Sequence, residues 1–129
     1  NSTDYSSGVT LVSGSQMTVA VSGTYNLQWS AQFENTDVSP VDCYVWLRVN
    51  GVDVPGSSGK IGMPARKTPS NPFHSLIGWN FFLTLTAGQN VQLIWLPTSL
   101  SVTIPFYPAQ VVPVIPSTAS VVATMNQVG

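Results

Sequence analysis

The sequence has very few charged residues, with five acids and four bases among 129 residues. A typical soluble domain is about 25% charged, whereas this chain is 7% charged. Its net charge is −1 and it has no run of like charges, which argues against binding to nucleic acid or an anionic membrane surface. The chain is 43% hydrophobic, so with so little charge its solubility depends on the uncharged polar residues Ser, Thr, Asn and Gln. We therefore expect other subunits to cover part of its surface.

Cysteine and histidine are equally scarce, with one residue of each. A single cysteine excludes an intrachain disulfide framework, and one Cys with one His cannot form a structural zinc cluster. Cys43 lies beside Tyr44, Val45 and Trp46, and we predict that it is a small core residue rather than a catalytic thiol. The lack of disulfides fits folding in a reducing cytoplasm, which includes viral proteins that later leave it.

Sequence motifs for catalysis are missing as well. Residues 56–60 (Gly-Ser-Ser-Gly-Lys) lack the spacing of a phosphate-binding loop, and no Gly-x-Ser-x-Gly elbow is present. The acids are dispersed along the sequence. Glu34, Asp37 and Asp42 could still meet around a cation. Alternatively, any two acids could face each other across the cleft of a glycosidase. We expect no enzyme activity, no metal and no other cofactor.

Long apolar runs are also lacking. None approaches the roughly 20 residues of a membrane span, so membrane insertion is not expected, and no basic-then-apolar leader opens the chain. Because the chain starts at Asn1 rather than Met, we expect it to be cut from a longer polypeptide.

Alternation of apolar and polar residues is present throughout and predicts β-strands. The clearest strand covers residues 24–34, and the next covers 42–49 before Asn50-Gly51, which favour a type I′ hairpin turn into Val52. Trp29 and Trp79 are predicted to pack in the core. Further strands are predicted at 9–12, 17–21, 76–86, 91–95, 101–106 and 120–127. The segments 55–75 and 106–116, rich in Gly, Ser or Pro, are predicted to be loops or edge segments.

Eight or more short strands without a helical period predict an all-β sandwich or jelly roll of two antiparallel sheets, in a single domain over residues 1–129. Several of these strands are apolar on both faces, and only one face can point into the sandwich. Water-exposed apolar area is disfavoured by about 25 cal/mol per Å². We therefore predict a subunit interface built from Tyr44, Trp46, Phe82, Ile94 and Leu96.

The few cations suggest a second kind of surface. Three of the four lie in the predicted loop 55–75, next to the single histidine. They could bind an anionic sugar or phosphate group, or they could simply solubilise the loop. With an acid from another loop, the candidate ligand-binding residues are Lys60, Arg66, Lys67, His74 and Asp37.

The order of three motifs resembles a known family. Gly-Thr-Tyr-Asn-Leu at 23–27 opens a strand, Val-Trp-Leu-Arg-Val-Asn-Gly follows at 45–51, and Phe-Leu-Thr-Leu-Thr-Ala-Gly-Gln-Asn-Val-Gln-Leu occupies 82–93. Together, over about residues 8–127, they resemble the tumour necrosis factor-like or complement-type globular-head jelly roll. Gln89-Asn90 replaces the Gly-Asp of many relatives. Residues 121–125 lack the aromatic-rich closing strand of animal members, so the chain is most similar to distal domains of bacteriophage fibre and virion proteins.

The resemblance implies a tumour necrosis factor-like jelly roll of eight to ten strands that assembles as a homotrimer. It also implies a place on the virion, as a surface appendage or on the capsid exterior, in the C-terminal domain of a longer fibre or capsid-associated chain. The implied partners are other virion proteins and a host cell-surface glycan or protein. Our leading hypothesis is thus a non-enzymatic, trimeric structural and recognition domain. The alternative is a carbohydrate-binding module of a larger enzyme, which would be a monomer with an open face of coplanar aromatics.

Overall fold

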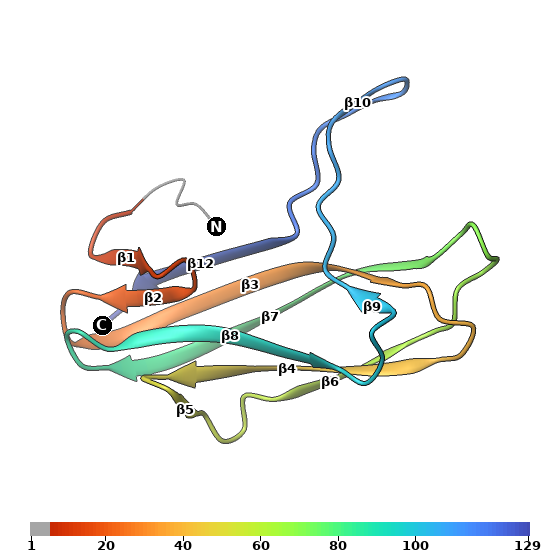
Figure 1. Cartoon of the computed structure of the whole chain (residues 1–129). Coiled ribbons are helices and arrows are strands. Elements are labelled where there is room, and N and C mark those ends of the chain that lie inside the picture. Colours follow the sequence, from red (N-terminus) through yellow and green to blue (C-terminus); the bar gives the residue numbers. More distant parts are fainter. Residues whose placement is uncertain (1–5) are drawn as a thin grey trace.

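Antiparallel strands make up most of the chain in the computed structural model, which describes residues 6–129 (Figure 1). In that range there are twelve strands and no helix, which confirms the all-β prediction. Sheet A has the order β1 (Val9–Val12), β2 (Gln16–Val19), β8 (Asn90–Pro97), β4 (Val41–Val49), and both β5 (Val52–Asp53) and β6 (Gly59–Met63) pair with β4. Sheet B has the order β12 (Val121–Gln127), β3 (Gly23–Asn35), β7 (Phe73–Leu85), with β9 (Val102–Thr103) also paired to β3.

The two sheets pack face to face, as in a β-sandwich, with one hydrophobic core between them. The buried side chains of β3 alternate from Tyr25 to Phe33, as the sequence predicted, and meet Val45 and Leu47 of β4. The hydroxyl of Tyr25 donates a hydrogen bond to the carbonyl of Val21 (2.6 Å), so this buried ring keeps its polar group satisfied.

Cys43 is fully buried in this core, which confirms its prediction as a core residue. Burial raises the pKa of its thiol to about 11, because the thiolate would be poorly solvated there. The predicted hairpin turn is also confirmed, because Asn50 and Gly51 have φ angles of 46° and 80° and Val49 pairs with Val52.

The predicted loops were partly wrong. Residues 55–75 contain β6 and the start of β7, and β6 forms because its backbone pairs with β4 from Val41 to Val45. Residues 106–116 contain the strands β10 (Gln110–Val111) and β11 (Val114–Ile115), which pair with each other. Conversely, the predicted strand 101–106 contains only the two residues of β9.

One of the two tryptophans expected in the core is half exposed. Trp29 is buried, but 46% of Trp79 remains accessible, so that expectation was wrong for Trp79. The reason is its strand, because β7 lies at the edge of sheet B and has no neighbour on its outer side. The Trp79 ring packs on Phe81 with centroids 4.6 Å apart and lies over Gly59.

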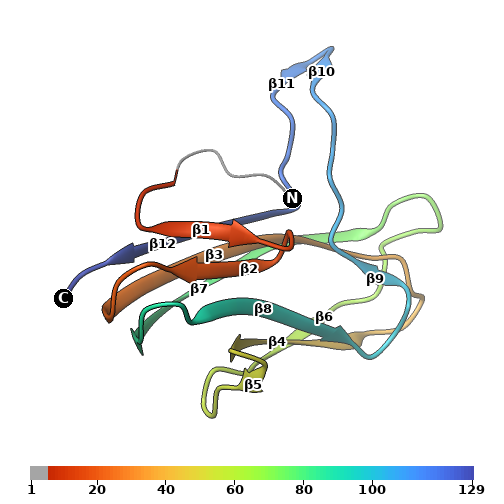
Figure 2. The same cartoon turned by 60° about the vertical axis from the view of Figure 1, so that its left-hand side comes forward.

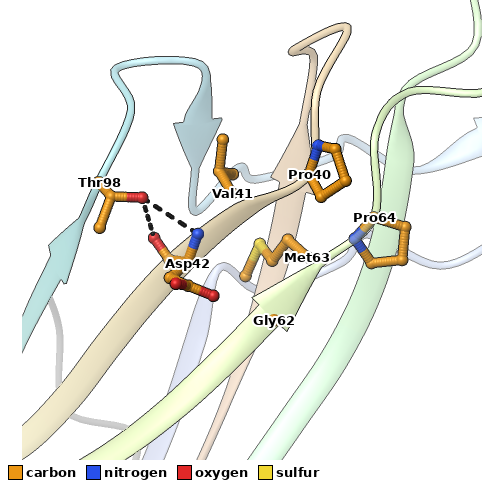
Figure 3. A pocket seen from close by; sticks show the side chains of 7 residues that line it. All are labelled: Pro40, Val41, Asp42, Gly62, Met63, Pro64 and Thr98. Atoms are coloured by element: carbon orange, nitrogen blue, oxygen red, sulfur yellow. Dashed lines mark hydrogen bonds between the residues drawn. The ribbon is translucent and has the colours of Figure 1, made fainter.

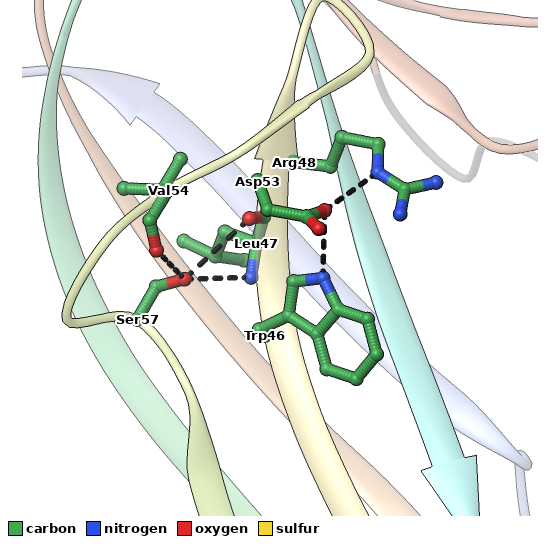
Figure 4. A network of polar contacts seen from close by, with 6 residues as sticks. All are labelled: Trp46, Leu47, Arg48, Asp53, Val54 and Ser57. Carbon is green, nitrogen blue, oxygen red and sulfur yellow. Dashed lines mark hydrogen bonds and ion pairs between the residues drawn. The ribbon is translucent and has the colours of Figure 1, made fainter.

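The turn after β5 is held by a buried serine, Ser57 (Figure 4). Its Oγ accepts a hydrogen bond from the Leu47 amide (3.0 Å) and donates one to the Val54 carbonyl (2.8 Å). The segment from β5 to β6 is thereby fixed to the middle of β4.

We predict that Ser57→Ala lowers the free energy of unfolding by about 2 kcal/mol, because it leaves the buried Leu47 amide without an acceptor. Urea denaturation followed by tryptophan fluorescence measures the change. The matched control is Ser58→Ala, whose side chain is exposed and should change stability by less than about 0.5 kcal/mol. Equal effects of the two variants would show that Ser57 does not hold this turn.

Candidate assembly and recognition surfaces

The outer face of sheet A carries an aromatic and aliphatic cluster. Tyr44 is paired with Leu96 and Trp46 with Ile94 in the register of β4 and β8, so the four side chains share one face. We call Tyr44, Trp46, Ile94 and Leu96 the sheet A outer cluster. The opposite face of β4 is buried, so Trp46 points outward as the sequence analysis expected.

Charged residues surround the sheet A outer cluster. Asp53 accepts hydrogen bonds through the same carboxylate oxygen from Arg48 Nε (2.7 Å) and Trp46 Nε1 (2.8 Å) (Figure 4). The bond from Arg48, followed by that from Trp46, lowers the pKa of Asp53. Lys60 Nζ lies 3.4 Å from Asp42 Oδ2, and the negative charge of Asp42 raises the pKa of Lys60. The indole of Trp46 is thus held in place by a carboxylate on the neighbouring strand.

The outer face of sheet B is different, because it is uncharged across most of its width. Leu76 is 69% exposed and Phe82 is 64% exposed, and both belong to β7. They are paired with Gln32 and Asn26 of β3, and Val122 of β12 is paired with Ser30 on the same face. Phe82 therefore lies in sheet B, whereas the other four residues predicted for one interface lie in sheet A.

The charge distribution along the chain explains this difference. All nine charged residues precede residue 68, so residues 68–129 contain no Asp, Glu, Lys or Arg. Strands β7, β8 and β12 are built entirely from this neutral half. A surface that lacks charge and exposes large apolar groups is typical of the centre of a subunit interface.

A hairpin arm projects from the sandwich. Residues 106–118 form it, with the β10–β11 ribbon near its end, and Figures 1 and 2 both show it extending away from the two sheets. It leaves sheet B between β9 and β12, which lie on the edge of β3 opposite β7. Val111, Val112 and Val114 at its tip are 83–88% exposed. The arm thus holds apolar side chains away from the core of its own chain.

The base of the arm is anchored to sheet B. Backbone hydrogen bonds join Tyr107 and Thr118 in both directions (3.1 and 2.8 Å). The Tyr107 hydroxyl donates to the carboxylate of Glu34 and lies 3.1 Å from His74 Nδ1, whose ring meets the Tyr107 ring edge-on. Burial, followed by the contact with Glu34, raises the pKa of Tyr107 to about 12.

The five predicted ligand-binding residues contact different residues, and no shared contact partner joins all five into one site. Lys60 lies on strand β6 beside Asp42, and His74 lies on strand β7 beside Glu34 and Tyr107, so neither is in a loop. β6 pairs with β4, and β7 pairs with β3. The Gly and Pro content of residues 55–75 had hidden this strand pairing from the sequence analysis. Arg66 and Asp37 do meet, because the Arg66 amide donates to the Asp37 carbonyl (2.8 Å), with Lys67 next in the chain.

The Asp37 carboxylate is already used within the chain. One oxygen accepts the Ser39 amide and the other the Ser99 hydroxyl, both at 3.0 Å. These hydrogen bonds lower the pKa of Asp37, the one from Ser39 most. Asp37 therefore joins the loop after β3 to the loop after β8.

A shallow groove of about 600 Å³ lies at the end of sheet A (Figure 3). It is lined by Pro40, Val41, Asp42, Gly62, Met63, Pro64 and Thr98. Among these seven residues Asp42 is the only ionisable one, and its backbone amide and carbonyl both bind the Thr98 hydroxyl (3.0 and 2.9 Å). The groove offers a single carboxylate, whereas a glycosidase uses two.

The acids considered for a cation site have separate partners. Glu34 contacts Tyr107, Asp37 contacts Ser39 and Ser99, and Asp42 contacts Lys60. Within residues 6–129 no three His, Cys, Asp or Glu side chains come together in a way that could hold a metal ion. Over the same residues, no helix has the length and apolar character to cross a membrane.

Comparison with known proteins gives no family assignment. A scan against protein-family models finds no match to this chain, and a search of curated proteins finds no similar sequence.

The sequence analysis missed the arm and two of the exposed residues on sheet B, Leu76 and Val122. The signal that could have found them is the absence of charge after residue 67. The five residues at 111–115 (Val-Val-Pro-Val-Ile) are also unusually apolar for a loop rich in proline.

We predict that Tyr107→Phe lowers stability by about 1 kcal/mol near neutral pH, because it removes the hydrogen bond to Glu34. The folded protein keeps the Tyr107 proton to a higher pH than the unfolded chain, so this contribution is fully present below about pH 10. It should be lost as the pH rises from about 10 to about 12. Urea denaturation of both proteins across this range measures the difference, and a gap that persists above about pH 12 would contradict the assignment.

Proposed function

We propose that this chain is a non-enzymatic, homotrimeric structural domain of a virus particle, with a tumour necrosis factor-like jelly-roll fold. In this role it caps or decorates a bacteriophage fibre or capsid, and it contacts other virion proteins or a host-surface glycan or protein. The order of the three sequence motifs supports the viral and jelly-roll parts of this proposal.

The observation that carries the proposal is the uncharged, apolar character of sheet B. Leu76 and Phe82 are more than half exposed in a single chain, and residues 68–129 provide no charge to keep that surface in solution. Burying such side chains is favourable, at roughly 1.5–3 kcal/mol for each large one that becomes fully buried. Several of them on one face favour an obligate interface over a free surface.

Sheet B also has the arrangement that a ring of three copies needs. A cyclic trimer joins two different surfaces of each copy, so that each subunit meets the next in the same way. β7 forms one edge of sheet B, with the half-exposed Trp79, and β12 forms the other. If three sheets B surround a common axis, the β7 edge of one copy lies beside the β12 edge of the next.

The sheet A outer cluster then faces away from the axis and is the proposed recognition surface. Trp, Tyr and Arg are the side chains that most often dominate binding energy at interfaces, and Tyr44, Trp46 and Arg48 lie together here. Three such surfaces on one rigid trimer gain avidity when their targets are spaced to match.

The second candidate function, a carbohydrate-binding module of a larger enzyme, draws on the same cluster. Tyr44 and Trp46 are outward-facing aromatics, as sugar stacking requires. This alternative leaves sheet B without a partner and requires a monomer, so the oligomeric state separates the two functions.

We predict that light scattering at micromolar concentration gives the mass of three 13.8-kDa chains. A stable particle with the mass of one chain would rule out the trimer and favour the carbohydrate-binding module.

We also predict that Phe82→Asp weakens trimer formation by about 30-fold or more, because it places an unpaired charge in the interface. Sedimentation velocity over a concentration series measures the shift. The control is Val52→Asp, which changes an equally exposed residue (68%) on β5 of sheet A and should leave the assembly unchanged. Dissociation by both variants alike would contradict an interface on sheet B.

A further inference from the structure

The arm is too apolar to be a free surface element. From residue 106 to residue 118 it has no charged side chain, and Phe106, Val111, Val112 and Val114 are all more than 60% exposed. Its only internal ladder is the two-residue pairing of β10 with β11, plus the bridge at Tyr107 and Thr118. A short two-stranded ribbon is only marginally stable in water by itself. The arm therefore needs a surface outside its own sandwich to bury its tip.

The base of the arm fixes where that surface must be. Tyr107 is bound at the pair formed by Glu34 of β3 and His74 of β7, so the arm starts at that end of sheet B. It extends past the β9–β12 edge (Figures 1 and 2). In the proposed ring, that edge lies beside β7 of the next copy.

The next copy offers a matching surface at the same height along the strands. Leu76 is two residues from His74 on β7, faces outward and is 69% exposed. The five residue steps from Tyr107 to Val112 span about 17 Å. This length exceeds the roughly 10 Å between packed sheets, so the tip of the arm can reach a neighbouring sheet. Both surfaces belong to the neutral half of the chain, so their contact buries no unpaired charge.

From these observations we infer that the arm of each copy docks on β7 of the neighbouring copy, with Val112 and the valines beside it against Leu76. This inference rests on the proposed trimer and names the element that links one subunit to the next. The arms make the contact heterologous and close the ring, so that each chain both donates an arm and receives one.

Cysteine cross-linking tests this arrangement. The double variant Val112→Cys/Leu76→Cys is oxidised under mild conditions and run on a denaturing gel without reductant, with Cys43 left in place because its thiol is buried. A closed ring should give a covalently linked trimer, because each chain forms one bond to each neighbour. The matched control is Val112→Cys/Phe82→Cys, which moves the second cysteine about 20 Å along β7 and should stay unlinked.

Each outcome decides the inference. A covalent trimer in the Leu76 pair alone supports it. If light scattering gives a trimer but the Leu76 pair stays unlinked, or if both pairs link equally, arm docking at Leu76 is wrong while the proposed trimer stands. A monomer by light scattering overturns both.

A charge at the tip gives an independent readout that leaves the sandwich unchanged. Val112→Asp should raise the concentration at which half the trimer dissociates by about 30-fold, whereas Val52→Asp on β5 of sheet A should have no such effect. A far-ultraviolet circular dichroism spectrum that matches that of the parent protein shows that the sandwich still folds. Unchanged dissociation of the Val112→Asp protein would overturn the inference.

Discussion

The long antiparallel ladder between β3 and β7 fixes the character of sheet B. It runs without a break from the pair Gly23 and Leu85 to the pair Asn35 and Phe73. Because successive side chains point to opposite faces, this register buries Leu27 and Ala31 and at the same time turns Phe82 outward. A shift by one residue would exchange the two faces. Core packing and an exposed apolar surface thus follow from one pairing.

The uneven distribution of charge gives the outer faces of the two sheets different characters. Ion pairs surround the sheet A outer cluster, with Arg48 beside Asp53 and Lys60 beside Asp42. Such exposed pairs add little stability, but they keep a surface in solution and orient a partner. Three of the four strands of sheet B (β7, β9 and β12), and the arm, come from the half of the chain without charge. This difference is the basis for proposing that sheet B serves assembly and sheet A serves recognition.

Much of the fold could be predicted from the sequence, because apolar alternation is strong where a strand has one buried face. Residues 24–34 and the Asn50-Gly51 turn illustrate this. The pattern failed where tertiary pairing decides the structure. β6 contains two glycines within Gly59–Met63 and forms through its pairing with β4, so it has little strand signal of its own. The predicted interface grouped Phe82 with Trp46 because periodicity identifies a second apolar face on each strand, but it does not tell which sheet the strand joins.

The most direct test of a shared sheet B is hydroxyl-radical footprinting of the native protein, which measures the solvent accessibility of individual side chains. If three copies bury this face, Phe82 and Leu76 should be strongly protected relative to the unfolded chain, while Val52 and Val38 on the remaining surface are oxidised readily. Oxidation of Phe82 at the rate expected for a side chain that is 64% exposed would contradict the account.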